Sequence, residues 1–257
     1  MHKLHSIFIL LAIWILASCA AKKPYLRKGQ TNTEIESIDP NNIDYELFMV
    51  GDIGATSNHV EQGDIVALIK SELAKNDVEK SVIFLGNSFN ESGFPDEEST
   101  DFSKVDAATK QCITELKDHT DKVYFIPGNT EWYDGHDHSV SALQHVEDYV
   151  ESAVGGKNIF APSDGCGQPK VIKLTDDLLL LLIDSQWVLQ GDRFGERKKS
   201  GCDIDDELEM VAFIQEVLSK NKNKNVVIAA HHPVHSNGKT GGNYSAKSHL
   251  LPLPIFR

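Results

Sequence analysis

The sequence has few cationic side chains and few cysteines. Its 257 residues hold 25 lysines and arginines against 38 aspartates and glutamates, a formal net charge of −13. Because proteins bind nucleic acid by neutralising phosphates with lysine and arginine, this balance argues against a nucleic-acid partner. Four cysteines do not make a disulfide-dense scaffold. The 40% hydrophobic share excludes wholesale disorder and allows a sizeable core.

Long apolar runs are also lacking. The run Ile7–Ala17 follows Lys3 and is too short for a transmembrane helix, but it has the length of a signal-peptide core. It ends in Leu16-Ala17-Ser18-Cys19, which resembles the processing site of bacterial lipoproteins. An ordinary secretory signal with an incidental cysteine is the alternative interpretation.

The lipoprotein resemblance implies a position in the cell envelope. Residues 1–18 would be the signal peptide, and Cys19 would be acylated and hold the protein on a membrane, at the outer membrane or facing the periplasm. Residues 19–44 would then include the lipidated cysteine and a polar tether.

The remaining cysteines differ in their surroundings. An exported protein meets an oxidising compartment, where disulfides persist. Cys166 and Cys202 both stand beside glycines in loop-like sequence and are the candidate pair. Cys112 falls in a helical pattern and is expected to be a buried thiol.

Strand and helix patterns alternate after residue 45, without internal repeats or low-complexity tracts. The alternation predicts an α/β fold in which helices cover a largely parallel sheet, with one hairpin near residue 176. The expected strands are 46–50, 81–85, 122–126, 171–174, 178–184 and 225–230, and the expected helices are 64–75, 103–118, 139–152 and 205–219.

Polar residues follow several of these strands. They are Asp52, Asn87, Asn129, Asp184 and His231. In α/β folds, ligands gather outside the carboxyl ends of the strands, and carboxylate, amide and imidazole groups are metal ligands. The pattern therefore indicates a metal-binding rim, although a polar residue after any one strand is usually only part of a turn.

From Tyr45 to the end of the chain, the sequence resembles the calcineurin-like metallophosphoesterases and, among them, the purple acid phosphatase-like branch. The motifs that carry the resemblance are Gly51-Asp52-Ile53-Gly54, Gly86-Asn87-Ser88-Phe89-Asn90, Gly128-Asn129-Thr130-Glu131-Trp132 and Ala230-His231-His232-Pro233-Val234-His235-Ser236-Asn237-Gly238.

The resemblance implies a fold and a reaction. The fold would be a four-layer αββα sandwich. Two divalent or mixed-valence metal ions (Mn, Zn, Fe or Mg) would supply a hydroxide that attacks phosphorus. The substrate would be a phosphorylated small molecule or another phosphoester.

Carried over residue by residue, the resemblance makes Asp52, Asn129 and His231 metal ligands. Asn87 takes the position of the metal-bridging aspartate, so it is a fourth candidate ligand with an amide in place of a carboxylate. His232 is the candidate catalytic residue, which would contact the substrate phosphate; simple packing is the alternative.

The sequence also departs from the family pattern. Asn90 stands where the purple branch has tyrosine, and Thr130 stands where the family has a histidine that protonates the leaving group. The closing Gly-His-x-His motif does not follow His231, so residues 45–257 read as a partial domain, with a sandwich incomplete at the C-terminus.

Other polar residues have weaker claims. His136 and His138 spell the closing motif in the wrong place, so a solvated loop or a local metal site is expected there. His59 reads as a loop or helix-start residue, and Asp184 as structural or as a support for the ligands. His235 flanks the expected ligand His231 within its motif. Packing is expected for Trp132 and Trp187.

Three interpretations follow. The first is an exported metal-dependent phosphoesterase, present as a fragment or as a diverged paralogue with impaired activity. The second is a catalytically inactive, lipid-anchored binding protein on the same scaffold. The third is an α/β lipoprotein whose turns only resemble ligand sites.

Overall fold

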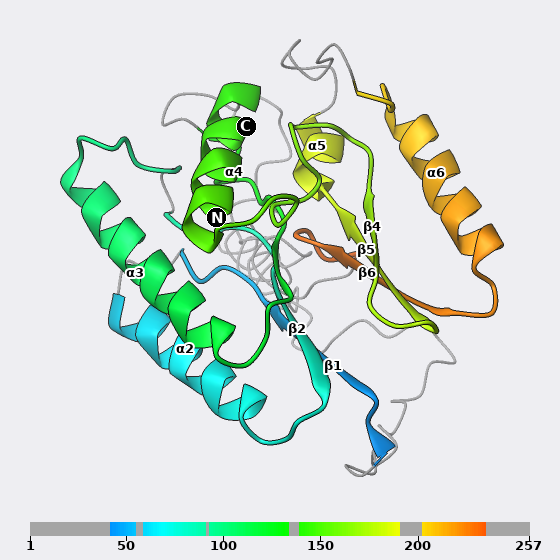
Figure 1. The fold of residues 1–257 in the computed structure, drawn as a ribbon. Helices are drawn as coiled ribbons and strands as arrows, with labels where there is room; N and C mark the ends of the chain where they lie inside the picture. Colours follow the sequence, from blue (N-terminus) through cyan, green and yellow to red (C-terminus); the bar gives the residue numbers. More distant parts are fainter. Residues whose placement is uncertain (1–41, 55–58, 91–92, 134–138, 191–201, 235–257) are drawn as a thin grey trace, which may run out of the picture. The chain divides into compact units, whose positions relative to one another are not determined.

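Strands and helices alternate along the chain, as the hydrophobic pattern predicts. The structure is a computed structural model and describes residues 42–54, 59–90, 93–133, 139–190 and 202–234. The described helices and strands belong to one compact unit, residues 39–232, with a mixed α/β fold (Figure 1).

The first sheet contains three parallel strands in the order β1-β2-β3. These are β1 (Tyr45–Val50), β2 (Glu79–Phe84) and β3 (Val123–Phe125), and the helices α2 (His59–Leu73) and α3 (Thr100–Lys117) connect them. The two helices lie side by side (Figure 1). After β3 comes α4 (Val140–Val154).

The second sheet has the order β4-β5-β6. Strands β4 (Lys170–Lys173) and β5 (Leu178–Ile183) form an antiparallel hairpin, and β6 (Asn225–Ala230) runs parallel to β5. The segment between β5 and β6 contains α5 (Ser185–Gln190) and α6 (Glu207–Lys220).

Two details differ from the sequence prediction. The alternation predicts a largely parallel sheet, but the strands divide between two sheets because the β4–β5 hairpin pairs with β6 rather than with β3. Helix α5 was not predicted, since six residues are too few to show helical periodicity.

Strand β2 is at the centre of the core. Its residues after Glu79 are all buried, and the side chains of Val82, Ile83 and Phe84 alternate between two hydrophobic clusters. Val82 and Phe84 pack in the cluster that includes α2, α3 and α4, whereas Ile83 packs with Leu180 and Leu182 of β5. Side chains from both sheets therefore share the second cluster.

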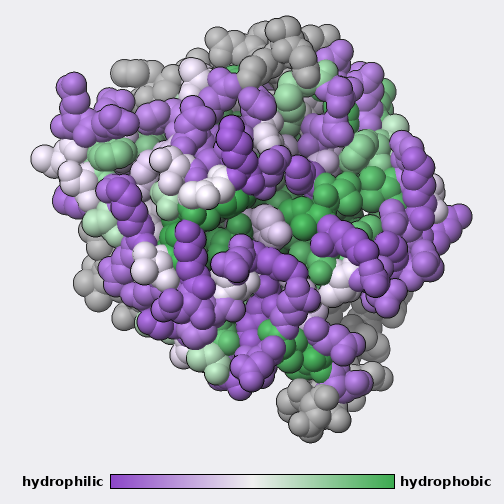
Figure 2. All heavy atoms as spheres, in the orientation of Figure 1, coloured by the Kyte–Doolittle hydropathy of each residue, from purple (hydrophilic) through white to green (hydrophobic). Residues whose placement is uncertain are grey.

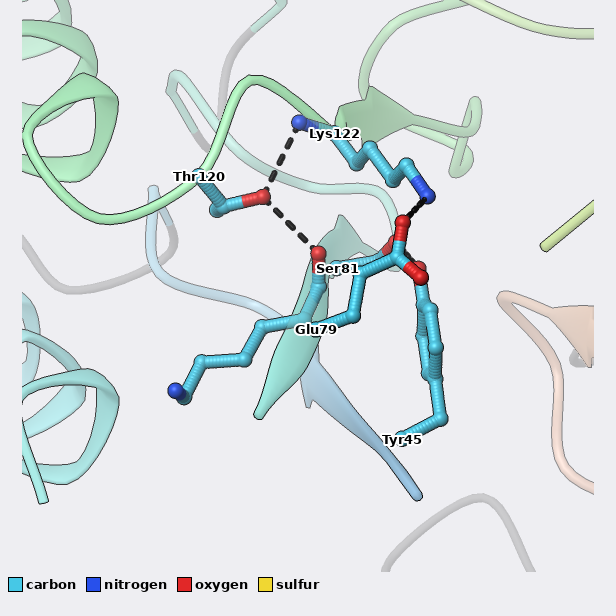
Figure 3. Close-up of polar contacts among 6 residues, drawn as sticks. Tyr45, Glu79, Ser81, Thr120 and Lys122 are labelled. Carbon is cyan, nitrogen blue, oxygen red and sulfur yellow. Dashed lines mark hydrogen bonds and ion pairs between the residues drawn. The ribbon is translucent and has the colours of Figure 1, made fainter. Parts of the chain in front are cut away.

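The amino ends of the first sheet are joined by polar contacts (Figure 3). The Tyr45 hydroxyl lies 2.5 Å from the Ser81 hydroxyl, and Lys122 forms an ion pair with Glu79. The Thr120 hydroxyl donates to the backbone oxygen of residue 80 and accepts from the Lys122 backbone N–H. These contacts align the strands at their amino ends, which are opposite the end of the sheet that carries Asp52 and Asn87.

The cysteines pair as the sequence indicates. Cys166 and Cys202 form a disulfide with a Cα–Cα distance of 5.5 Å. Cys112 is a buried free thiol on α3, and burial raises the pKa of this thiol to about 12. It is therefore uncharged at neutral pH and acts as a small hydrophobic side chain.

Part of the surface is hydrophobic. Figure 2 shows hydrophobic residues exposed between hydrophilic ones on the face seen in Figure 1. Among the exposed large hydrophobic residues are Leu208 and Val211 of α6, with 79% and 49% of their surface exposed, and Ile228 of β6. Of the residues of α6, Met210 is the one that is buried.

Candidate functional site

Two neighbouring strands end in residues with an unusual backbone. Asp52 follows β1 and Asn87 follows β2, with φ angles of 55° and 52°. Aspartate and asparagine tolerate this left-handed region better than most residues. The backbone N–H of Gly54 donates to the backbone oxygen of Asn87 at 2.9 Å. The backbone N–H of Asp52 donates to the backbone oxygen of Gly86 at 3.2 Å. The two loops are therefore held together directly at the carboxyl ends of their strands.

Glycines let the neighbouring loop approach. A Cβ atom on Gly86 would lie 2.5 Å from the Gly128 nitrogen, and one on Gly128 would lie 2.5 Å from Asn87 Oδ1. Both distances are too short for real atoms, so a side chain at either position would force the loops apart. The two glycines bring Asn87 and Asn129 to the same rim.

Glu131 joins the loops after β2 and β3. Its side chain is 2% exposed. Its carboxylate accepts three backbone N–H groups: Asn87 and Gly128 at 2.8 Å on Oε2, and Ser88 at 2.7 Å on Oε1. Hydrogen bonds to a charged acceptor are stronger than neutral ones. The sequence prediction did not single out this residue as functional.

The orientation of the Asn87 amide follows from the groups that it contacts. The Thr130 backbone N–H, which can only donate, lies 3.1 Å from Asn87 Oδ1, and the Thr130 hydroxyl lies 3.0 Å from the same oxygen. The Asn87 nitrogen must therefore face the other way. It donates to Asp52 Oδ1 at 2.9 Å and to Asn129 Oδ1 at 3.1 Å.

His231 completes the rim from the second sheet. Its Nδ1 donates to the Leu85 oxygen at 2.7 Å, so in the neutral ring Nε2 carries a lone pair. Nε2 lies 3.3 Å from Asn129 Oδ1, an acceptor whose orientation Asn87 determines. The lone pairs of two acceptor atoms at this distance repel each other unless a cation or a proton lies between the atoms.

His232 lies beside His231, with a ring–ring distance of 4.7 Å. Its Nδ1 lies 2.9 Å from the Ser185 hydroxyl, and its backbone N–H donates to the same oxygen at 3.0 Å. Burial lowers the pKa of His232, the neighbouring His231 lowers it further, and Asp52 opposes the shift. Ser185 therefore orients an imidazole that is neutral at physiological pH.

Asp184 follows β5 and is buried, with 1% of its surface exposed. Its carboxyl accepts from Trp132 Nε1 and from the Trp187 backbone N–H, both at 2.9 Å. Burial raises its pKa to about 7; the hydrogen bonds oppose the shift and the charge of Glu131 adds to it. Both tryptophans are buried. The geometry agrees with a structural role for Asp184 and with packing for the tryptophans.

The four expected ligand positions thus gather at one rim. Asp52, Asn129 and His231 present an oxygen or nitrogen acceptor there, whereas Asn87 presents its amide nitrogen. Cys19, His136, His138 and His235 lie outside the described residues. His59 begins α2, as expected for a helix-start residue.

The sequence pattern does not predict roles for Glu131 and Ser185. Glu131 is two residues after Asn129 in the same motif, and its position between a threonine and a tryptophan is the available signal. Ser185 directly follows Asp184 and starts α5. Its contact with His232 spans 47 residues, and no local pattern indicates such a contact.

The donor atoms at the rim suit a divalent cation in part. A carboxylate, an amide oxygen and an imidazole nitrogen form a mixed set that Mn, Zn, Fe and Mg accept. The Asn87 nitrogen does not fit, because its hydrogens repel a cation. Within the described part of the chain, no group of three or more His, Cys, Asp or Glu side chains lies close enough to hold a metal.

Comparison with models of known protein families gives no match, and no curated protein matches the chain. Among the described residues, no helix has both the length and the apolar character needed to cross a membrane.

Proposed function

We propose that the protein hydrolyses phosphate esters with the help of a divalent metal ion at the rim formed by Asp52, Asn129 and His231. The observation that supports this most is the pair of facing acceptors, Asn129 Oδ1 and His231 Nε2, 3.3 Å apart. Lone pairs at this spacing match two neighbouring ligands of one ion, at about 2.0–2.2 Å from each. When bound, the ion would supply a positive charge to the phosphate oxygens and would acidify a water molecule.

The residues around this position have separate roles in the proposal. Asn129 and His231 hold the ion, and the Leu85 oxygen fixes the ring of His231 through Nδ1. Asp52, whose side chain reaches the rim from β1, adds the negative charge. His232, positioned by Ser185, donates an N–H to the phosphate.

The proposal includes the fold and the cellular site. The two sheets share the cluster around Ile83 and Leu180, as the inner layers of an αββα sandwich would. Acylation of Cys19 would place the domain at the cell envelope, facing phosphorylated substrates there. Fatty-acid labelling of the intact chain, lost in Cys19→Ala, tests the anchor.

Hydrolysis of p-nitrophenyl phosphate by the purified chain with Mn²⁺, Zn²⁺ or Mg²⁺ tests the reaction. We expect Asp52→Ala and His231→Ala to lose at least about 100-fold in kcat/KM, because each removes a charge or a ligand next to the phosphate. Asp121→Ala and His119→Ala are the matched controls, since both residues precede β3 at the opposite end of the sheet. Equal turnover by the Asp52 and His231 variants and the wild type would sink the assignment.

A second candidate is a binding protein that holds a phosphorylated ligand without hydrolysing it. The observation in its favour is Thr130, whose N–H and hydroxyl are both used by Asn87 Oδ1, so that no proton donor for a leaving group stands there. Inorganic phosphate that binds the wild type, but not His232→Ala, without turnover of any ester would favour this candidate.

A further inference from the structure

The Asn87 amide nitrogen lies between two acceptors. It is 2.9 Å from Asp52 Oδ1 and 3.1 Å from Asn129 Oδ1, so each of its hydrogens has a partner. A primary amide nitrogen carries partial positive charge on these hydrogens. It therefore satisfies, from within the protein, both of the oxygen atoms between which a cation would have to bind.

The Asn87 side-chain amide cannot flip without losing hydrogen bonds. Rotation by 180° would bring its nitrogen against the Thr130 N–H and its oxygen against the oxygens of Asp52 and Asn129. The backbone of Asn87 is also held, because its N–H donates to Glu131 at 2.8 Å. Both the side chain and its base are thus fixed in the observed orientation.

We infer that the Asn87 amide takes the place of a cation between Asp52 and Asn129, so that the rim accepts one divalent ion, beside Asn129 and His231, and not two. This inference rests on the proposed function, because it assumes that the remaining position binds a metal. It makes Asn87 and Thr130 a matched pair: the threonine donates twice to the oxygen and thereby turns the nitrogen toward the rim.

Aspartate at position 87 would reverse the situation. One of its oxygens could still accept both donors of Thr130. The other would stand about 3 Å from Asp52 Oδ1 and Asn129 Oδ1, and two negative charges this close repel strongly unless a cation lies between them. The variant Asn87→Asp has almost the same shape as the wild type and differs in this charge.

The experiment counts the Mn²⁺ ions bound by the purified chain and measures its melting temperature in EDTA and in Mn²⁺. We expect one ion for the wild type and two for Asn87→Asp. In EDTA the variant should melt about 5–10 °C below the wild type, and Mn²⁺ should raise its melting temperature by a larger shift than that of the wild type. Asn158→Asp is the control, since Asn158 also has a left-handed backbone, with φ 62°, but lies on the surface beside Lys170.

Each result decides the inference. A wild-type count other than one, or the same count on Asn87→Asp as on the wild type, would overturn it. If Asn87→Asp does not fold, the wild-type count still decides, with one ion in support and any other number against. If the wild type binds one Mn²⁺ ion and Asn87→Asp binds two, but p-nitrophenyl phosphate is not hydrolysed, the inference stands and the proposed hydrolysis is refuted. If the wild type binds two ions and hydrolyses the ester, the proposed hydrolysis stands and the inference is refuted.

Discussion

Replacing Glu131 by glutamine should lower the free energy of unfolding by about 3–5 kcal/mol. Glutamine has the shape of glutamate, so no cavity forms, and the change acts through hydrogen bonds alone. The carboxylate accepts three backbone N–H groups in a site where 2% of the side chain is exposed. Glutamine has one acceptor oxygen, which can serve Asn87 and Gly128, but its NH₂ group then faces the Ser88 N–H.

The magnitude follows from these contacts. A buried N–H without a partner costs about 1–3 kcal/mol, and a bond that changes from a charged to a neutral acceptor loses about 1 kcal/mol. The Ser88 N–H loses its partner, and the bonds from the Asn87 and Gly128 N–H groups change to a neutral acceptor. At about 2–4 °C per kcal/mol for a domain of this size, the melting temperature should fall by about 10 °C.

Urea and thermal unfolding followed by circular dichroism measure the effect. Glu216→Gln is the control: Glu216 lies on the surface of α6 and pairs with Lys220, and exposed pairs contribute about 0–1 kcal/mol. If Glu131→Gln is as stable as Glu216→Gln, then Glu131 does not hold the loops after β2 and β3 together. The geometry of the rim would then not depend on Glu131.

Two further predictions concern other parts of the domain. The disulfide between Cys166 and Cys202 closes a segment of 36 residues, and its loss in the double serine variant should cost about 3–4 kcal/mol in urea unfolding; a variant as stable as the oxidised wild type contradicts this. Burial raises the pKa of Glu147 from its ordinary 4.5 to about 7, against the hydrogen bond from the Asp164 N–H. The folded state therefore keeps a proton that the unfolded state releases, and stability falls as the pH rises from about 4.5 to 7. Glu147→Gln should be more stable than the wild type at pH 8, by on the order of 1–2 kcal/mol, with no such advantage at pH 4; an equal difference at both pH values would show that the charge is not the cause.

The prediction of the elements depended on local patterns. Continuous apolar runs such as Leu178–Ile183 predict buried strands, and the structure has strands there and at the other expected positions. The strand-end residues were found in the same way, because a polar residue after a buried strand lies at the sheet edge. The division into two sheets was not visible from the alternation, since it depends on the strand with which the β4–β5 hairpin pairs.

The candidate site shows the same distinction at the level of single side chains. The sequence predicted that Asp52, Asn87, Asn129 and His231 would lie on one rim, and the structure brings them there. It did not predict which end of the Asn87 amide faces the other residues. That orientation changes Asn87 from a candidate ligand into a hydrogen-bond donor, and it depends on Thr130, 43 residues away.

The sequence by itself determined the chemistry that the rim can offer: a carboxylate, two amides and an imidazole, each after a strand of an α/β fold. It could do so because residue type, strand pattern and the residues that tolerate a left-handed backbone are properties of short segments. Only the tertiary structure decided how these groups are used. Hydrogen bonds have direction, and whether a group such as the Asn87 amide accepts or donates at the rim depends on fixed donors, the Thr130 N–H above all, that the fold brings from another loop.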